Sequence, residues 1–422
     1  MHNMTRSPLF FMALTIFIDF AGFGLILPLL PFWAEHLGAN PTEVGLILTI
    51  YALAQFIFTP ILGALSDRYG RKPIIVGSLL IEAFSFALSG LAGSLVVLLI
   101  ARFIGGIGAS NIGSAQAVVA DVTPPEGRAR GMGMIGAAIG LGFVVGPAIG
   151  GLLSPIGSAA PFMVAMAVAI VNALLVIAFL PETHKERGAA KTGSSAKKGS
   201  GLLPSGVGQL LRNTTITRLI MITLLFTMAF TAMEAVFALF SQHTFGWTAK
   251  ENGYIFTYVG FVVVLMQGGL VGQLVKRFGE RTLLIVGLVL LAAGLALLPW
   301  STSLAFMLVA LGIVSAGNGA VTPTSSALLS LASPHGAQGE TLGFAQGIAS
   351  LGHIIGPLAA GGIYSLFGPG APFLVGSILT ILAILIALPS MPISPKLRAT
   401  EAIAIDKGEV QEMKTTSIAR ER

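Results

Sequence analysis

The chain contains no cysteine and few charged residues. Of its 422 residues only 10% are charged, whereas 54% are hydrophobic and 53 are glycine. The missing thiols exclude disulfide bridges and thiolate metal sites. The shortage of charge and the excess of apolar residues exclude a soluble globular domain. The composition therefore predicts an all-α protein embedded in a lipid bilayer.

Signatures of several other protein classes are also missing. The sequence holds no G-x-S-x-G nucleophile elbow, no H-E-x-x-H pair and no phosphate-binding loop, so we expect neither an enzyme nor an ATP-driven pump. The chain has a net charge of +6. In a membrane protein such an excess of lysine and arginine is usually found in the cytoplasmic loops. Because no basic patch alternates with exposed aromatic residues, we expect no nucleic-acid partner.

Twelve apolar segments approach the roughly 20 residues that a membrane-spanning helix needs. The first exceeds the apolar core of a secretory signal, about 7–15 residues, and lacks a small-residue cleavage site, so we expect it to be retained. The twelve segments lie near residues 8–33, 43–65, 73–92, 95–118, 130–153, 159–181, 215–241, 252–275, 282–300, 303–329, 340–366 and 371–390.

Lysine and arginine gather on one side of these segments. They occur before the first segment, at Arg6, and in the connections after segments two, four, six and eight, whereas the opposite side holds only Lys250. Positive residues mark the cytoplasmic side of a membrane protein. The bias predicts that both termini lie in the cytoplasm.

The sequence carries an internal duplication. G-A-L-S-D-R-Y-G-R-K from Gly63 returns in altered form from Gly272, an offset of 272 − 63 = 209, and G-P at Gly146 returns at Gly356, an offset of 210. Lys276 replaces Asp67 in the second copy, so the two halves are not equivalent. We predict an N-terminal six-helix bundle (1–181), a cytoplasmic linker (182–213), a C-terminal six-helix bundle (214–392) and a cytoplasmic tail (393–422).

Four ionisable residues lie well inside the predicted spans, away from their ends, namely Asp19, Glu82, Arg102 and Glu234. A central charge costs about 2.5–3.5 kcal/mol on insertion scales, so each should face a cavity or a partner. At 1.5 Å per residue, Asp19 and Glu82 both lie roughly 15 Å deep, and Arg102 approaches from the other side. Proton coupling is one interpretation and a static ion pair is the other. Glu234 is expected nearer the outer surface, where it could be solvated.

Further polar residues inside the spans are candidates for a substrate path. Hydrogen bonds that only pack helices together explain them equally well. These candidates are Gln55, Asn111, Gln116, Asn318, Gln346 and His353.

Four motifs together resemble the major facilitator superfamily, specifically its twelve-helix drug/proton antiporters, over nearly the whole chain. They are the loop from Gly63 to Lys72, L-I-A-R-F-I-G-G-I-G-A around Arg102, the stretch from Gly142 to Gly151, and Gly24 to Pro31. I-D-F-A-G-F-G-L around Asp19 and P-E-T-H from residue 181 resemble bacterial tetracycline/proton antiporters. The third-helix carboxylate of that subgroup would align near Ser85, whereas this chain has Glu82, which leaves a broader multidrug exporter open.

The resemblance implies two six-helix bundles that exchange an inward proton for an outward amphipathic drug by alternating access in a bacterial plasma (inner) membrane. It implies a monomer with no metal and no cofactor besides the proton. A proton symporter that imports a small metabolite, and a channel, are the alternatives. Asp67, with Arg71 and Asp121, would cap and pair across the cytoplasmic contact between the halves. The implied latch comprises Gly63, Asp67, Arg68, Gly70, Arg71, Lys72 and Asp121, and the implied helix-packing motif, which lets the halves rock, comprises Gly142, Gly146, Pro147, Gly150 and Gly151.

Overall fold

The computed structural model describes residues 8–123, 128–183, 212–333 and 338–389. Within these ranges the chain is helical and contains no strand. The helices are α1 (Pro8–Ile26), α2 (Leu30–His36), α3 (Pro41–Tyr69), α4 (Arg71–Gly90), α5 (Leu95–Gly108), α6 (Ile112–Val122), α7 (Arg128–Leu153), α8 (Ala160–Phe179), α10 (Thr214–Phe245), α11 (Ala249–Leu265), α12 (Val271–Phe278), α13 (Glu280–Leu297), α14 (Leu304–Ala332), α15 (Gln338–Phe367) and α16 (Ala371–Ala387).

The helices long enough to cross a membrane follow the order of the predicted segments. Among the described residues, 11 helices have the length and apolar composition of membrane spans, and the shorter apolar helix α16 comes after them. A 3-10 turn, Ala109–Asn111, joins α5 to α6 within one span, Leu95–Val119. A π-helical turn, Met266–Leu270, joins α11 to α12 within another, Ala249–Phe278.

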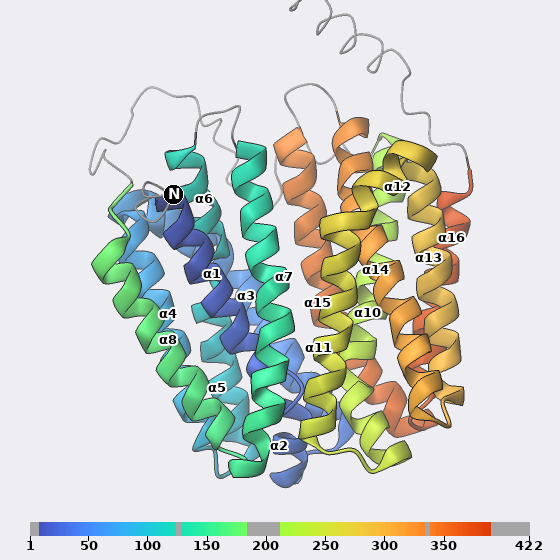
Figure 1. The fold of residues 1–422 in the computed structure, drawn as a ribbon, viewed down its shortest axis with the longest axis horizontal. Coiled ribbons are helices and arrows are strands. Elements are labelled where there is room, and N and C mark those ends of the chain that lie inside the picture. Colours follow the sequence, from blue (N-terminus) through green and yellow to red (C-terminus); the bar gives the residue numbers. More distant parts are fainter. Residues whose placement is uncertain (1–7, 124–127, 184–211, 334–337, 390–422) are drawn as a thin grey trace, which may run out of the picture.

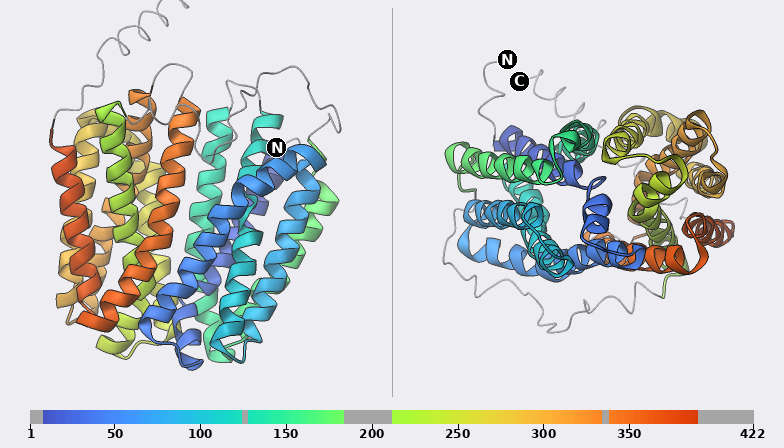
Figure 2. Two further views of the ribbon diagram at one scale, coloured as in Figure 1. Left: turned by 180° about the vertical axis from the view of Figure 1, so that it is seen from behind. Right: turned by 90° about the horizontal axis from the view of Figure 1, so that it is seen from below.

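The helices gather in two bundles. Figure 1 shows α1 to α8 on one side and α10 to α16 on the other, and Figure 2 shows the same division from behind and along the helices. The largest buried apolar cluster draws its members from residues 216–387, and two others draw theirs from residues 12–180 together with Leu239. The limits of the linker and tail stay a prediction, because residues 184–211 and 390–422 lie outside the described residues, as do Arg6 and the basic residues of those segments.

Corresponding helix starts in the two bundles carry the same capping arrangement. The Asn40 side chain accepts a hydrogen bond from the Glu43 backbone, and Glu43 reaches back to the Asn40 N–H (2.8 Å). Thr248 and Glu251 repeat this capping box at an offset of 248 − 40 = 208. Such boxes satisfy two backbone N–H groups that a helix start otherwise leaves unpaired. The repeat therefore extends from sequence motifs to local hydrogen bonding.

The loops at the other end of the helices also correspond. Gly70 lies between α3 and α4 with φ of 106°, and Gly279 lies between α12 and α13 with φ of 81°. Positive φ favours glycine because it has no Cβ. The end of the molecule that holds Gly70 and Gly279 is called the cytoplasmic end below, as the positive residues predict, and the end that holds Asn40 and Thr248 is called the outer end.

The two bundles meet at the outer end. Thr42 Oγ1 lies 3.0 Å from Ser365 Oγ, and Thr49 Oγ1 donates a hydrogen bond to the Ile354 carbonyl (2.8 Å). The Glu35 side chain on α2 also interacts with Gln242 on α10. These contacts join α2 and α3 to helices of the second bundle.

Glycine contacts show that the bundles separate toward the cytoplasmic end. A Cβ added at Gly253 would lie 2.6 Å from the Pro147 carbonyl oxygen, and Gly45 lies equally tightly against Pro357. Further along the same membrane spans, toward the cytoplasmic end, an added Cβ would meet no atom within 4 Å at Gly63, Gly136, Gly272 and Gly347. The space between the bundles is also lined by Leu329 and Leu342, near the cytoplasmic ends of α14 and α15. The structure is therefore closed at the outer end and open toward the cytoplasmic end.

Candidate functional site

Two acidic side chains meet inside the first bundle. The carboxyl groups of Asp19 on α1 and Glu82 on α4 are in hydrogen-bonding contact. Asn111, in the 3-10 turn that interrupts the fourth span, donates from Nδ2 to Asp19 Oδ2 (3.4 Å). Glu82 is only 2% exposed. The three residues are called the acid cluster below.

Arg102 lies beside this cluster but is not bonded to it. Its side chain is 2% exposed, and its Cζ lies 4.7 Å from the centre of the Tyr51 ring on α3. Nε and Nη1 have no hydrogen-bond partner, and no ion pair joins Arg102 to a carboxyl group within the described residues. The guanidinium still interacts electrostatically with Glu82. Arg102 is thus held by an aromatic face next to two acids.

Glycines of the fourth span bring these groups together. A Cβ added at Gly106 would lie 2.7 Å from Ala54 Cβ on α3, and one at Gly108 would lie 2.8 Å from the Glu82 backbone nitrogen. Absent side chains let helix backbones approach closely. Ser85, near which the carboxylate of the tetracycline/proton antiporters was expected to align, donates to the Ala101 carbonyl (2.7 Å) and so joins α4 to α5.

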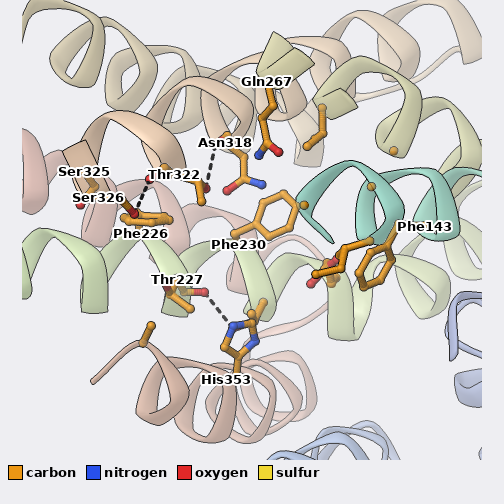
Figure 3. Close-up of a pocket in the computed structure, with 18 of the residues that line it drawn as sticks. Phe143, Phe226, Thr227, Phe230, Gln267, Asn318, Thr322, Ser325, Ser326 and His353 are labelled. Carbon is orange, nitrogen blue, oxygen red and sulfur yellow. Dashed lines mark hydrogen bonds between the residues drawn. The ribbon is translucent and has the colours of Figure 1, made fainter. Parts of the chain in front are cut away.

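A cavity of about 440 Å³ lies between the bundles. Helices α7, α10, α11, α14 and α15 supply most of its wall. Figure 3 shows Phe230, Gln267, Asn318 and His353 projecting into one space, with Phe143 on the opposite side. The wall is mainly apolar and aromatic with a few separated polar groups, which is typical of small-molecule sites.

Glu234 is the one carboxylate among the described residues that line the cavity. Its counterpart in the first bundle is Leu27, which also lines the cavity. The offset of 234 − 27 = 207 equals that between Ala21 and Met228, whose carbonyls face Gly146 and Gly356. The cavity is therefore asymmetric in charge. The structure places Glu234 at the cavity rather than with Asp19, Glu82 and Arg102.

The predicted path residues divide between two places. Asn318, Gln346 and His353 line the cavity. Gln55 instead donates from Nε2 to the Ala109 carbonyl (3.1 Å) within the first bundle, Asn111 belongs to the acid cluster, and Gln116 is exposed on α6. Sequence reasoning missed Gln267 and the cavity phenylalanines, because polar and aromatic residues on a membrane helix give the same signal whichever way they face. The missed aromatic residues of the wall are Phe143, Phe226, Phe230 and Phe256.

Among the described residues, the hydrogen bonds and ion pairs of the loop lie within the first bundle. Arg71 Nη1 lies 2.5 Å from Asp67 Oδ1, and Arg71 Nε donates to Asp121 Oδ2 (3.4 Å). The Asp67 side chain is 63% exposed and meets no described residue of the second bundle. Asp67 lies in the last turn of α3 and does not cap α4. Its expected pairing across the halves is not formed in this conformation, in which the cytoplasmic end is open.

Other residues hold the loop in place. The Arg71 backbone N–H, in the first turn of α4, donates to Glu182 Oε1 (2.9 Å), and Lys72 Nζ donates to the Ile177 carbonyl (2.7 Å). Arg68 lies over the Tyr69 ring, with Cζ 5.2 Å from its centre. Gly63 has open space beside it, and Gly70 provides the positive-φ turn.

The glycine stripe of α7 makes two kinds of contact. Gly142, Gly146 and Gly150 face α1 within the first bundle. Gly151 faces the second bundle, where an added Cβ would lie 2.9 Å from the Lys250 carbonyl oxygen. In α15, Gly352 and Gly356 face α10, and Gly361 faces α3 of the first bundle. The motif thus packs each bundle internally and also forms the contact between them.

Membrane-spanning helices in two related bundles, with a cavity between them, define a membrane transporter for small molecules. The chain belongs to the Major Facilitator Superfamily, whose family model matches residues 12–277 and 268–416. The members of this family are transporters.

Relatives and solved structures agree with this assignment. The chain is 32% identical over 395 residues to the class C tetracycline resistance protein of Escherichia coli, covering 92% of this chain and 96% of that one. It is 32% identical over 379 residues to multidrug resistance protein 2 of Bacillus subtilis, covering 87% and 91%. The crystal structure of the human organic anion transporter MFSD10 (TETRAN) matches with a TM-score of 0.67 and 25% identity, covering 90% and 98%.

A second structure supports the fold alone. The inward-facing, occupied bacterial homologue of the human lysosomal transporter Spinster matches with a TM-score of 0.73 at 17% identity, covering 90% of this chain and 95% of that one.

Proposed function

We propose that the chain is a proton-coupled exporter of amphipathic drugs that works by alternating access between its two bundles. Relatives named for tetracycline and multidrug resistance support a drug as substrate. The cavity between the bundles, open toward the cytoplasmic end, supports loading from the cytoplasm. Protons entering the cell would drive the export.

The contact between Asp19 and Glu82 is the observation that carries proton coupling. Two ionised carboxylates in contact repel each other strongly, and in a buried site one proton shared between them relieves this repulsion. Arg102 beside the pair offers a compensating positive charge when the proton leaves. The acid cluster can therefore be stable both with one shared proton and without it. A proton-coupling site requires both states.

The cavity supports a substrate that is largely apolar and carries a positive group. Aromatic rings offer stacking surfaces, and Glu234 offers one negative charge without a lysine or arginine among the described lining residues. A cation would form a charge-assisted hydrogen bond with this carboxylate. Because Glu234 is separate from the acid cluster, it is assigned here to the substrate, and any part it has in proton coupling would be through competition with that substrate.

In the proposed cycle, the cytoplasmic end closes when Asp67 and its loop meet the second bundle, and the outer contacts then part. Lys276 cannot replace Asp67, so the latch is one-sided. The protein would work as a monomer in a bacterial inner membrane, with both termini in the cytoplasm.

Accumulation measurements test the direction and the driving force. The protein is expressed in bacteria that lack their main drug exporters, and the uptake of tetracycline and of ethidium is followed with and without a proton uncoupler. Export predicts that expression lowers the accumulation of at least one drug and that the uncoupler abolishes this effect. Unchanged accumulation of both drugs, or an uncoupler-sensitive rise, would contradict drug export, and the rise would favour an importing symporter.

A further inference from the structure

We propose that Tyr51, Phe23 and Phe143 form an aromatic column that links Arg102 to the central cavity and to the contact between the bundles. The column would transmit the charge state of the acid cluster to the conformation of the transporter. The inference rests on the proton coupling proposed above and names the residues that carry it.

The first contact of the column is between Arg102 and Tyr51. The guanidinium Cζ lies 4.7 Å from the ring centre, while Nε and Nη1 lack hydrogen-bond partners. A cation over an aromatic ring is held less strongly than one in a bidentate hydrogen bond to a desolvated carboxylate. Glu82 Oε2 is also without a hydrogen-bond partner. Arg102 therefore has a second position within the same site, on the acids.

Loss of the shared proton would move Arg102 between these positions. The ionisable groups that interact here are Asp19, Glu82, Arg102 and Tyr51, from four different helices. With one proton on the acid pair, the pair carries one negative charge. When the proton leaves, a second negative charge appears beside a guanidinium with two free donors. Arg102 then leaves the Tyr51 ring for the carboxylates.

Phe23 connects Tyr51 to α7, so a movement of Tyr51 would affect the packing of α7. Its ring on α1 stacks on Tyr51 with centres 5.2 Å apart, and its edge meets Phe143 on α7 with centres 6.0 Å apart. Aromatic pairs at these separations attract each other beyond the effect of their buried area. A displaced Tyr51 ring therefore changes the packing of both phenylalanines.

Phe143 occupies the place where such a change matters. Its side chain lines the cavity. Pro147, four residues later, has no N–H to offer the Phe143 carbonyl, and this carbonyl faces Gly260 of the second bundle, where an added Cβ would lie 2.9 Å away. Phe143 thus contacts Phe23, lines the cavity and meets the opposite bundle.

Phe20 provides a matched control. Its ring also lies on α1 and contacts Phe143, with centres 5.6 Å apart, but no ring contact joins it to Tyr51 among the described residues. Phe20→Leu therefore removes one aromatic neighbour of Phe143 without interrupting the column, whereas Phe23→Leu interrupts it.

The absence of cysteine allows a direct measurement of conformation. Ile156 and Phe367, 73% and 75% exposed at the outer end of the two bundles, are replaced by cysteine and spin-labelled. Distances between the labels are measured by pulsed electron paramagnetic resonance in acidic and in alkaline buffer. The labelled parent should change its distance distribution between the two buffers. Phe20→Leu and Tyr51→Phe should keep the change, and Phe23→Leu and Tyr51→Leu should lose most of it.

The outcomes separate the column from the proposed function. If the labelled parent responds to pH and Phe23→Leu and Tyr51→Leu respond equally, the column is refuted while proton coupling stands. If the parent does not respond, proton coupling fails and the column with it. Unfolding temperatures are measured for all variants. Should Phe23→Leu be unstable, the paired Tyr51→Phe and Tyr51→Leu variants decide, because only the second removes the ring.

Discussion

The carbonyl oxygen of Pro147 lies directly against Gly253 of the opposite bundle. This contact has a counterpart in which Pro357 lies against Gly45, and the offsets are 253 − 45 = 208 and 357 − 147 = 210. The two halves of the duplicated chain therefore make the same type of proline–glycine contact, once in each direction, and these two contacts close the outer end. Both contacts must part if the outer end opens during transport.

Gly253→Ala should favour opening of the outer end. The new Cβ would lie 2.6 Å from the Pro147 oxygen and 2.6 Å from Gly151 Cα, so the backbones must separate. Overpacking of this kind costs about 1–3 kcal/mol, which shifts a two-state population roughly 5- to 150-fold. Distances between labels at positions 156 and 367 should lengthen. Gly272→Ala, where an added Cβ meets nothing within 4 Å, is the control; equal distributions in both variants would contradict the prediction.

Glu234→Gln should weaken the binding of cationic drugs selectively. Hydrogen bonds to charged groups contribute about 1.5–3 kcal/mol, so the Kd of ethidium should rise at least about tenfold. A neutral amphipathic drug should bind nearly as it does to the parent. Fluorescence titration of purified protein measures both. Gln267→Ala, an uncharged change in the same wall, should affect the two drugs alike. If Glu234→Gln weakened the binding of both drugs equally, the charge of Glu234 would not be what recognises the cationic drug.

Asp67→Asn should impair transport without preventing insertion into the membrane. The side chain is 63% exposed in this conformation and forms an ion pair only with Arg71 among the described residues, so little stability depends on it here. Its effect should appear when the cytoplasmic end closes. Transport rates are compared at equal membrane abundance with Lys276→Gln, the same position in the second copy, which should transport at nearly the parent rate. Parent rates in Asp67→Asn would refute the latch.

The depth of residues in a helical span could be read from the sequence, because an α-helix rises by a fixed 1.5 Å per residue. The fixed rise predicts that Asp19 and Glu82 lie at one level, and their carboxyl groups are in contact in the structure. The repeat offset of about 209 also held enough information to find the capping box at Thr248 from the one at Asn40.

Depth alone does not reveal what a side chain faces. Glu234 was expected toward the outer surface, yet it lines the cavity, because the extent of the cavity depends on how far the bundles separate. The contact between Tyr51 and Arg102 could not be predicted from the sequence, because an aromatic residue facing lipid and one facing a cation have the same sequence pattern. Contacts of Asp67 across the bundles depend on the conformer, and conformers of one sequence differ by only a few kcal/mol.

Drug-driven proton movement tests the coupling most directly. Everted membrane vesicles are acidified inside by respiration, and tetracycline or ethidium, whichever the parent exports, is added while the internal pH is followed by a fluorescent dye. The parent should release protons from the vesicles when the drug is added, and Asp19→Asn should bind the drug without releasing them. Proton release of normal size in Asp19→Asn would show that the acid cluster does not couple the transporter to protons.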